Sequence, residues 1–109
     1  MFDAFFRGAD RAPRHSVRPV DFEWDSAKAR ENRQRHGVSF LEASTVLDDP
    51  LARSYRDPDH SWDEDRSITL GRSRWQRVLV VIHTDRGEIT RIISARPASP
   101  RERRHYEEG

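Results

Sequence analysis

The apolar run VLVVI, at residues 78–82, limits the possible folds of this sequence more than any other feature. Such a continuous run, inside the segment 77–84, predicts a central strand that is covered on both faces. The sequence DRG at residues 85–87 predicts a tight hairpin loop. Residues 88–96 repeat isoleucine and are expected to return as a neighbouring strand. The fold is therefore expected to be organised around a β-hairpin.

Two helices are expected before this hairpin. Asp25 is a good N-cap, and the helix that follows is predicted to run for about eleven residues and to end at Gly37. Ser39 and Glu42 have the S-x-x-E spacing of a capping box, in which each side chain bonds the backbone of the other residue. They predict a second helix, which ends at the DDP sequence of residues 48–50.

The rest of the sequence predicts further strands and a last helix. Residues 22–24 are expected to form a short strand, 51–56 a weak strand, and 67–72 a strand that alternates polar with apolar residues. The sequence SPRE at residues 99–102 is a second capping box and opens a short helix through Tyr106. The predicted order is β-α-α-β-β-β-β-α. This is an α+β fold with two N-terminal helices packed on a mostly antiparallel sheet and a short C-terminal helix.

The length and polarity of the chain indicate one small domain. The 109 residues have room for one core. Residues 1–20 mix arginine, aspartate and proline without a sustained period, so we expect a poorly ordered arm before a domain at residues 21–109. Charged residues make up 36% of the sequence and the mean hydropathy is −0.98. The core is therefore expected to be thin, and a partner is expected to cover part of it.

The types of charged and sulfur-containing residue narrow the function. The 20 basic and 19 acidic residues leave a net charge of +1, which does not by itself indicate a nucleic-acid-binding protein. Lys28 is the only lysine, and the other basic side chains counted here are arginines. A guanidinium group can bind phosphate through two parallel hydrogen bonds, which an ammonium group cannot do. The absence of cysteine excludes disulfides and thiolate chemistry. No apolar run is long enough to span a bilayer or form a signal peptide, so a cytoplasmic protein is expected.

No metal or other cofactor is expected. The sequence has five histidines without ligand spacing on a helix or hairpin: His15, His36, His60, His83 and His105. A cluster formed by Asp57, Asp59, His60 and Asp63 could hold a divalent cation in a metal-dependent nuclease. A solvated acidic loop is the preferred interpretation of these residues.

A polar stripe lies on the first predicted helix. Lys28, Asn32 and His36 are four residues apart and therefore share one face. This face is a candidate for binding or chemistry, but the preferred interpretation is a solvated helix surface on which His36 caps the last carbonyl groups near Gly37.

The preferred candidate site lies on the predicted sheet and the last helix. Its residues are Arg72, His83, Arg91, Arg96, Arg103 and Tyr106. Arginines there would bind a scissile phosphate and stabilise the charge of its transition state. His83 or Tyr106 would move protons, and the ribose 2′-hydroxyl would be the nucleophile, so that no metal is needed. The alternative is that His83 is a buried core histidine, because it shares a strand face with Leu79 and Val81.

Four motifs in a fixed order resemble one known family. They are W-D-x-x-K-x-x-x-N-x-x-x-H-G-V-x-F over residues 24–40, DDP at 48–50, TLGRS at 69–73, and RIISARPASPRERRHYEEG at 91–109. Together they resemble the BrnT family of type II toxin–antitoxin toxins. The arm at residues 1–20 departs from the usual pattern of that family.

The resemblance implies a RelE-like fold and an endoribonuclease that blocks translation. It also implies neutralisation by a BrnA-type antitoxin with a ribbon-helix-helix domain, in a heterotetramer that contacts operator DNA only through the antitoxin. The residues that best match the RelE-like scheme are Arg72, Arg96 and Tyr106, with His83 and Lys28 next. Lys28, Arg91 and Arg103 are expected to bind substrate. The alternative function is a non-catalytic RNA- or partner-binding module of the same fold.

Overall fold

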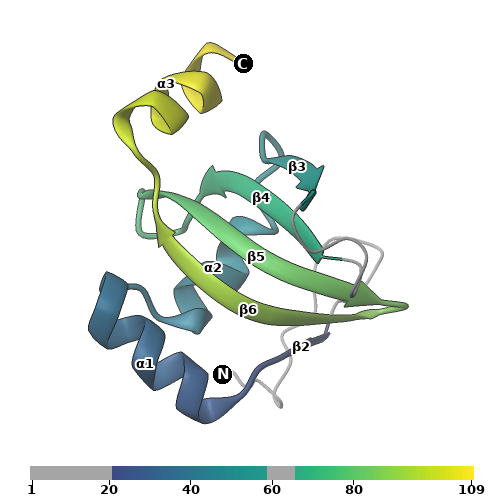
Figure 1. The fold of residues 1–109 in the computed structure, drawn as a ribbon. Coiled ribbons are helices and arrows are strands. Elements are labelled where there is room, and N and C mark those ends of the chain that lie inside the picture. Colours follow the sequence, from purple (N-terminus) through teal and green to yellow (C-terminus); the bar gives the residue numbers. More distant parts are fainter. Residues whose placement is uncertain (1–20, 59–65) are drawn as a thin grey trace.

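The computed structural model describes residues 21–58 and 66–109. The expected N-terminal arm and residues 59–65 lie outside this part of the chain. The described elements follow the predicted order (Figure 1) and are β2 (Asp21–Glu23), α1 (Ser26–His36), α2 (Phe40–Val46), β3 (Arg53–Arg56), β4 (Arg66–Arg72), β5 (Val78–Arg86), β6 (Ile89–Pro97) and α3 (Pro100–Glu108). The α+β class and the element order predicted from the sequence are confirmed.

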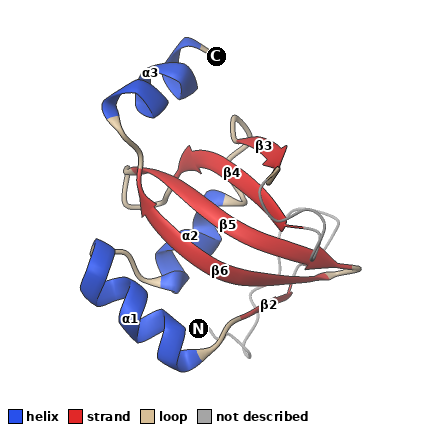
Figure 2. Cartoon of the chain, in the orientation of Figure 1, coloured by secondary structure: helices blue, strands red, loops and turns tan. Residues whose placement is uncertain are grey.

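The described strands form one five-stranded sheet with the order β2-β6-β5-β4-β3. Neighbouring strands are antiparallel, except that β2 pairs parallel with β6. The VLVVI run lies on β5 at the centre of the sheet, as predicted. Figure 2 shows α2 behind the sheet, α1 beside it below β6, and α3 beyond one end of the strands, so most of the near face carries no helix.

Apolar side chains pack on both sides of β5. Leu79 and Val81 join Phe40 and Val46 in the core between the sheet and the two N-terminal helices. Val78, Val80 and Leu70 form a smaller cluster on the other face, where Tyr106 of α3 covers them. The alternation of the two sets along β5 fixes the direction of every side chain of the strand.

The helix ends mostly follow from local chemistry. The Asp25 side chain accepts hydrogen bonds from the backbone N–H groups of Ala27 and Lys28, and Gly37 ends α1 with a positive φ of 69°. Ser99 and Glu102 form a complete capping box at the start of α3. These three predictions are confirmed.

The capping box predicted for α2 is only half correct. The Ser39 hydroxyl accepts from the backbone N–H of Glu42 at 3.0 Å. The Glu42 carboxylate, however, turns inward and accepts from Arg77 at 2.6 Å and from Ser73 at 2.8 Å. An arginine distant in the sequence therefore takes the acceptor that the local motif assigns to the helix N-terminus.

The hairpin turn is shorter than predicted. Asp85 and Arg86 belong to β5, and β6 begins at Ile89, so that Gly87 and Glu88 make the turn. Gly87 has a φ of 63°, the left-handed conformation that a two-residue hairpin requires. The backbone hydrogen bonds between β5 and β6 thus extend beyond the apolar residues from which the strand was predicted.

The polar stripe on α1 divides into a buried amide and exposed ends. Asn32 is 7% exposed. Its amide donates to the carbonyl oxygens of Val38 and Ala95 and accepts from the Ala95 N–H. Lys28 is exposed and His36 is half-buried. The Asn32 side chain therefore fastens α1 to β6, a structural role.

Candidate functional site

Three of the predicted arginines, Arg72, Arg91 and Arg96, lie on the face of the sheet opposite α1 and α2. Strand register places on this face Arg53 and Tyr55 of β3, Arg66, Ile68, Leu70 and Arg72 of β4, Val78, Val80, Ile82 and Thr84 of β5, and Arg91, Ser94 and Arg96 of β6. We call this surface the open face. Its apolar floor is bordered by guanidinium groups, an arrangement that suits a polyanion whose bases present flat aromatic faces.

Asp49 joins α3 to the end of β4. Its Oδ2 atom accepts from the Tyr106 hydroxyl at 2.6 Å and from the backbone N–H of Arg72 at 2.8 Å. The Arg72 guanidinium lies over the Tyr106 ring, 5.5 Å from the ring centroid. Gly71 allows this approach, because a Cβ atom there would lie 2.9 Å from Val46 and 3.2 Å from Oδ2 of Asp49.

The protonation states of Asp49 and Tyr106 suit a structural role, in which the two side chains hold α3 against the end of β4. Burial raises the pKa of the Tyr106 phenol, and the hydrogen bond to Asp49 raises it further. Burial alone would raise the pKa of Asp49, but the bonds from Tyr106 and from the backbone N–H groups of Arg72 and Leu51 outweigh it, so the pKa is lowered. Tyr106 therefore stays protonated and Asp49 stays charged near neutral pH. Tyr106 holds α3 and Arg72 in place and is poorly suited to act as a base.

An exposed histidine lies beside Tyr106, and the sequence did not single it out. The Nε2 atom of His105 lies 2.9 Å from the Tyr55 hydroxyl and 3.4 Å from the Arg53 guanidinium. His105 precedes Tyr106 on α3, and Arg53 and Tyr55 lie on the neighbouring edge strand β3. We call Arg53, Tyr55, Arg72, His105 and Tyr106 the α3 cluster. The separation of about fifty residues between Tyr55 and His105 left no local signal.

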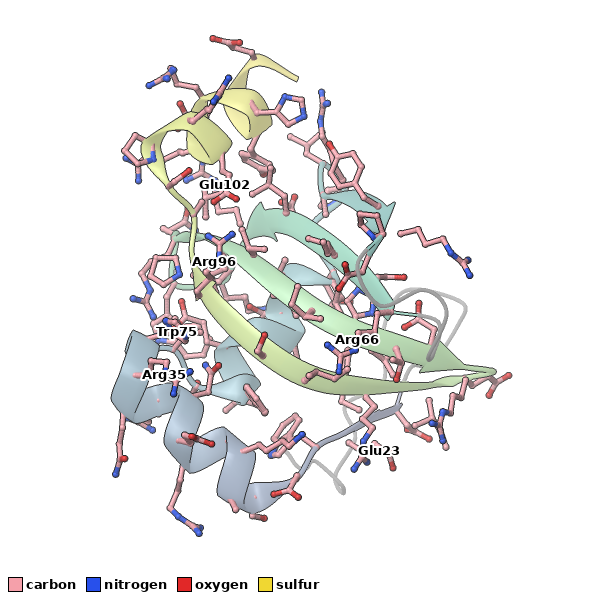
Figure 3. All side chains as sticks on the ribbon, in the orientation of Figure 1. Glu23, Arg35, Arg66, Trp75, Arg96 and Glu102 are labelled. Atoms are coloured by element: carbon pink, nitrogen blue, oxygen red, sulfur yellow. The ribbon has the colours of Figure 1, made fainter. Side chains whose placement is uncertain are left out.

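Arg96 lies on the open face but is engaged by α3. Its guanidinium makes a two-point contact with Glu102, at 2.8 and 2.9 Å, and Figure 3 shows the two labelled side chains meeting where β6 passes into α3. Arg96 therefore helps to dock the helix. A loss of activity on replacing Arg96 would combine any catalytic role with loosening of α3.

Acid is expected to weaken this docking. The hydrogen bond from Arg96 is the largest reason why the pKa of Glu102 is lowered to about 2. A lowered pKa stabilises the folded state above the unfolded value, and the contribution is lost as pH falls through the folded value. Because the pair is partly exposed and screened, we expect a contribution of only about 1 kcal/mol.

Urea unfolding of the wild type and of Glu102→Gln tests this expectation. Glutamine keeps the capping-box acceptor and removes only the charge. The difference in unfolding free energy should be present at about pH 6 and vanish near pH 2. A difference that stayed constant over this range would show that the ion pair does not stabilise the helix.

His83 does not join the predicted site. It lies on the helix side of β5, with Leu79 and Val81, and is 4% exposed. Its Nε2 atom lies 2.7 Å from Thr69 Oγ1 and its Nδ1 atom 2.9 Å from Asp85 Oδ1. The expectation that His83 shares a cleft with Arg72 and Tyr106 is corrected, because strand alternation puts the whole sheet between them. The alternative interpretation, a buried histidine with satisfied hydrogen bonds, describes its position.

The other predicted residues are dispersed. Arg91 lies on the open face, at the end away from α3, and its guanidinium contacts Glu23 at 3.2 Å. Arg103 is exposed on α3. Lys28 is on α1, which packs on the opposite side of the sheet. The structure thus brings together Arg72 and Tyr106, with Arg96 nearby, and leaves Lys28 and His83 apart.

The acidic cluster considered for metal binding is only partly described. Asp57 is buried, and its backbone N–H bonds the carbonyl oxygen of Arg66. Asp59, His60 and Asp63 lie outside the described residues. Within residues 21–58 and 66–109, no group of three or more histidines and carboxylates could hold a metal ion.

The fold and the open face together define a class. A mostly antiparallel sheet covered by helices on one side, with arginines, a histidine and tyrosines on or beside the other, is suited to bind phosphodiesters. The family model "Ribonuclease toxin, BrnT, of type II toxin-antitoxin system" matches residues 24–102. The chain therefore belongs to the BrnT family of ribonuclease toxins, and a type II toxin has a cognate antitoxin.

A solved structure supports the fold. The crystal structure of the ribonuclease toxin BrnT from Brucella abortus is similar, with a TM-score of 0.59 and 24% sequence identity. The match covers 73% of this chain and 97% of that one. A comparison with curated proteins finds no match. In the described part of the chain, every helix is too short or too polar to cross a membrane.

Proposed function

We propose that this chain is a metal-independent endoribonuclease that cleaves RNA at the α3 cluster and thereby inhibits translation. The observation that carries the proposal is the meeting of two arginines, one histidine and two tyrosines from β3, β4 and α3 beside the open face. Family membership supplies the reaction class, RNA cleavage. The cluster contains the groups that transesterification by a ribose 2′-hydroxyl requires.

Each step of the cleavage reaction is assigned to residues of the α3 cluster. The 2′-oxygen attacks the adjacent phosphorus, and its proton passes to the paired side chains of Tyr55 and His105. The bond from phosphorus to the 5′-oxygen breaks, and the pair returns a proton to that oxygen. Arg72 and Arg53 bind the phosphate and stabilise the additional charge of the transition state. The products are a 2′,3′-cyclic phosphate and a free 5′-hydroxyl.

The antitoxin is proposed to act by covering this face. The open face has a partly exposed apolar floor and clustered guanidinium groups, which suit an acidic or apolar segment of a partner. The proposed partner is a BrnA-type ribbon-helix-helix protein in a heterotetramer that contacts operator DNA only through the antitoxin. Occlusion predicts that the purified complex cleaves RNA far more slowly than the free toxin. Equal rates would exclude this mode of neutralisation.

Growth of cells that express the toxin tests the site. The wild type is expected to arrest growth, whereas the double variant Arg72→Ala with Arg96→Ala should permit it. Arg30→Ala on α1 is the matched control, since it removes an exposed arginine from the opposite side of the molecule. Arrest by the double variant at full strength would show that the site is elsewhere. Protein that binds RNA without cutting it would favour the non-catalytic alternative.

A further inference from the structure

A second group of cations lies at the end of the open face away from α3. Arg66 of β4, Thr84 of β5 and Arg91 of β6 are direct register partners on three adjacent strands. Their side chains therefore point to the same side of the sheet, with the threonine between the two arginines. Figure 3 labels Arg66, whose side chain lies over the open face, and Glu23, which borders the same end.

The threonine in this row has an unused hydroxyl. Thr84 is 2% exposed, and its Oγ1 atom is the one buried side-chain oxygen or nitrogen without a hydrogen-bond partner among the described residues. A buried hydroxyl without a partner is costly, and such groups are rare in native proteins. A ligand oxygen that accepts from this hydroxyl would remove the cost, once the side chains that cover Thr84 move aside to admit it.

The arginine on β6 is available for exchange. Arg91 contacts Glu23 at 3.2 Å, and the two side chains are 43% and 45% exposed. An exposed ion pair of this kind is weak and is screened by salt. A phosphate between the two arginine positions would compete with Glu23 and gain two charge-assisted contacts.

We propose that Arg66, Thr84 and Arg91 form a phosphate-binding subsite for the RNA backbone. The proposal rests on the proposed ribonuclease function. Along β5, the distance from position 78, which pairs with Arg72, to position 84 is about 20 Å. The subsite therefore holds a phosphate several nucleotides from the scissile bond, on the same face. It makes the enzyme favour long single strands over short ones.

The first experiment measures binding to an oligonucleotide whose riboses are all 2′-O-methylated, so that it is not cut. Arg66→Ala and Arg91→Ala should each weaken the Kd roughly tenfold. Each change should also lower the slope of log K against log salt by about 0.7. Glu23→Gln should strengthen binding, because it removes the competing carboxylate. Arg30→Ala is the charge-matched control and should leave both quantities unchanged.

Thr84→Val tests the hydroxyl separately. Valine has nearly the same shape and leaves no orphan donor, so the thermal midpoint should stay the same or rise while RNA binding weakens. Unchanged binding, with a raised midpoint, would show that the hydroxyl contacts no ligand and would overturn its part in the subsite.

The second experiment distinguishes the subsite from the ribonuclease function. The kcat/KM of each arginine variant is measured on a dinucleotide and on an oligonucleotide of about ten nucleotides. The loss should be much larger on the longer substrate. Equal losses, or none, would overturn the subsite while leaving the cleavage activity established. Failure of the wild type to cut either substrate would instead contradict the proposed function itself.

Discussion

Replacing Arg72 by alanine is expected to lower the kcat for RNA cleavage by about 10²- to 10³-fold, equivalent to roughly 3–4 kcal/mol of transition-state stabilisation. The guanidinium is held on the Tyr106 ring, so it is positioned before the substrate binds. A positioned cation stabilises developing phosphate charge without having to reorganise. Single-turnover kinetics on a labelled RNA measure the chemical step directly.

The fold should survive this change. The contact from Arg72 to Asp49 is made by the backbone N–H, which alanine retains. The thermal midpoint should therefore fall only slightly, and the Arg30→Ala control should cleave at the wild-type rate. A rate within about threefold of the wild type would remove Arg72 from the proposed mechanism, since a threefold change corresponds to only about 0.7 kcal/mol of transition-state stabilisation.

Asn32→Ala is expected to be the most destabilising change on α1, by about 3 kcal/mol. The amide makes three hydrogen bonds to the backbone of Val38 and Ala95, all in a buried setting. Alanine would leave these backbone groups without partners, and each such group costs roughly 1–3 kcal/mol unless water enters. Urea unfolding monitored by fluorescence gives the change in unfolding free energy.

The exposed residue Gln34 of the same helix provides the control for Asn32. Gln34→Ala should alter stability by no more than about 0.5 kcal/mol. If Asn32→Ala lowered the free energy of unfolding by less than about 1 kcal/mol, the Asn32 amide would not be what holds α1 against β6.

Local sequence chemistry predicted the fold well because its signals span only a few residues. Asp25, Gly37 and the Ser99 capping box act within one helical turn, and they are where the sequence predicts them. Where a distant residue competes, the local signal fails. Glu42 has the spacing of a capping box, yet Arg77, which lies 35 residues away, takes its carboxylate.

The candidate site was only partly predictable for the same reason. The sequence predicted that Arg72 and Tyr106 lie close together near the last helix. In the structure they are joined through Asp49, which the sequence indicated only as part of the end of a helix. The pairing of Tyr55 with His105 depends on where α3 lies relative to the edge strand β3, which no local sequence pattern indicates. The sequence left both interpretations of His83 open, and the structure agrees with the one that its position on the face of Leu79 and Val81 favoured, a buried histidine.

The most direct test of the central claim is cleavage of RNA by the purified, antitoxin-free protein in excess EDTA, with the end groups of the products identified. The proposed mechanism predicts cleavage at an undiminished rate, fragments that end in a 2′,3′-cyclic phosphate, and no cutting where a 2′-deoxyribose replaces the ribose at the scissile bond. Loss of cleavage in EDTA, or cleavage at the 2′-deoxyribose, would contradict it.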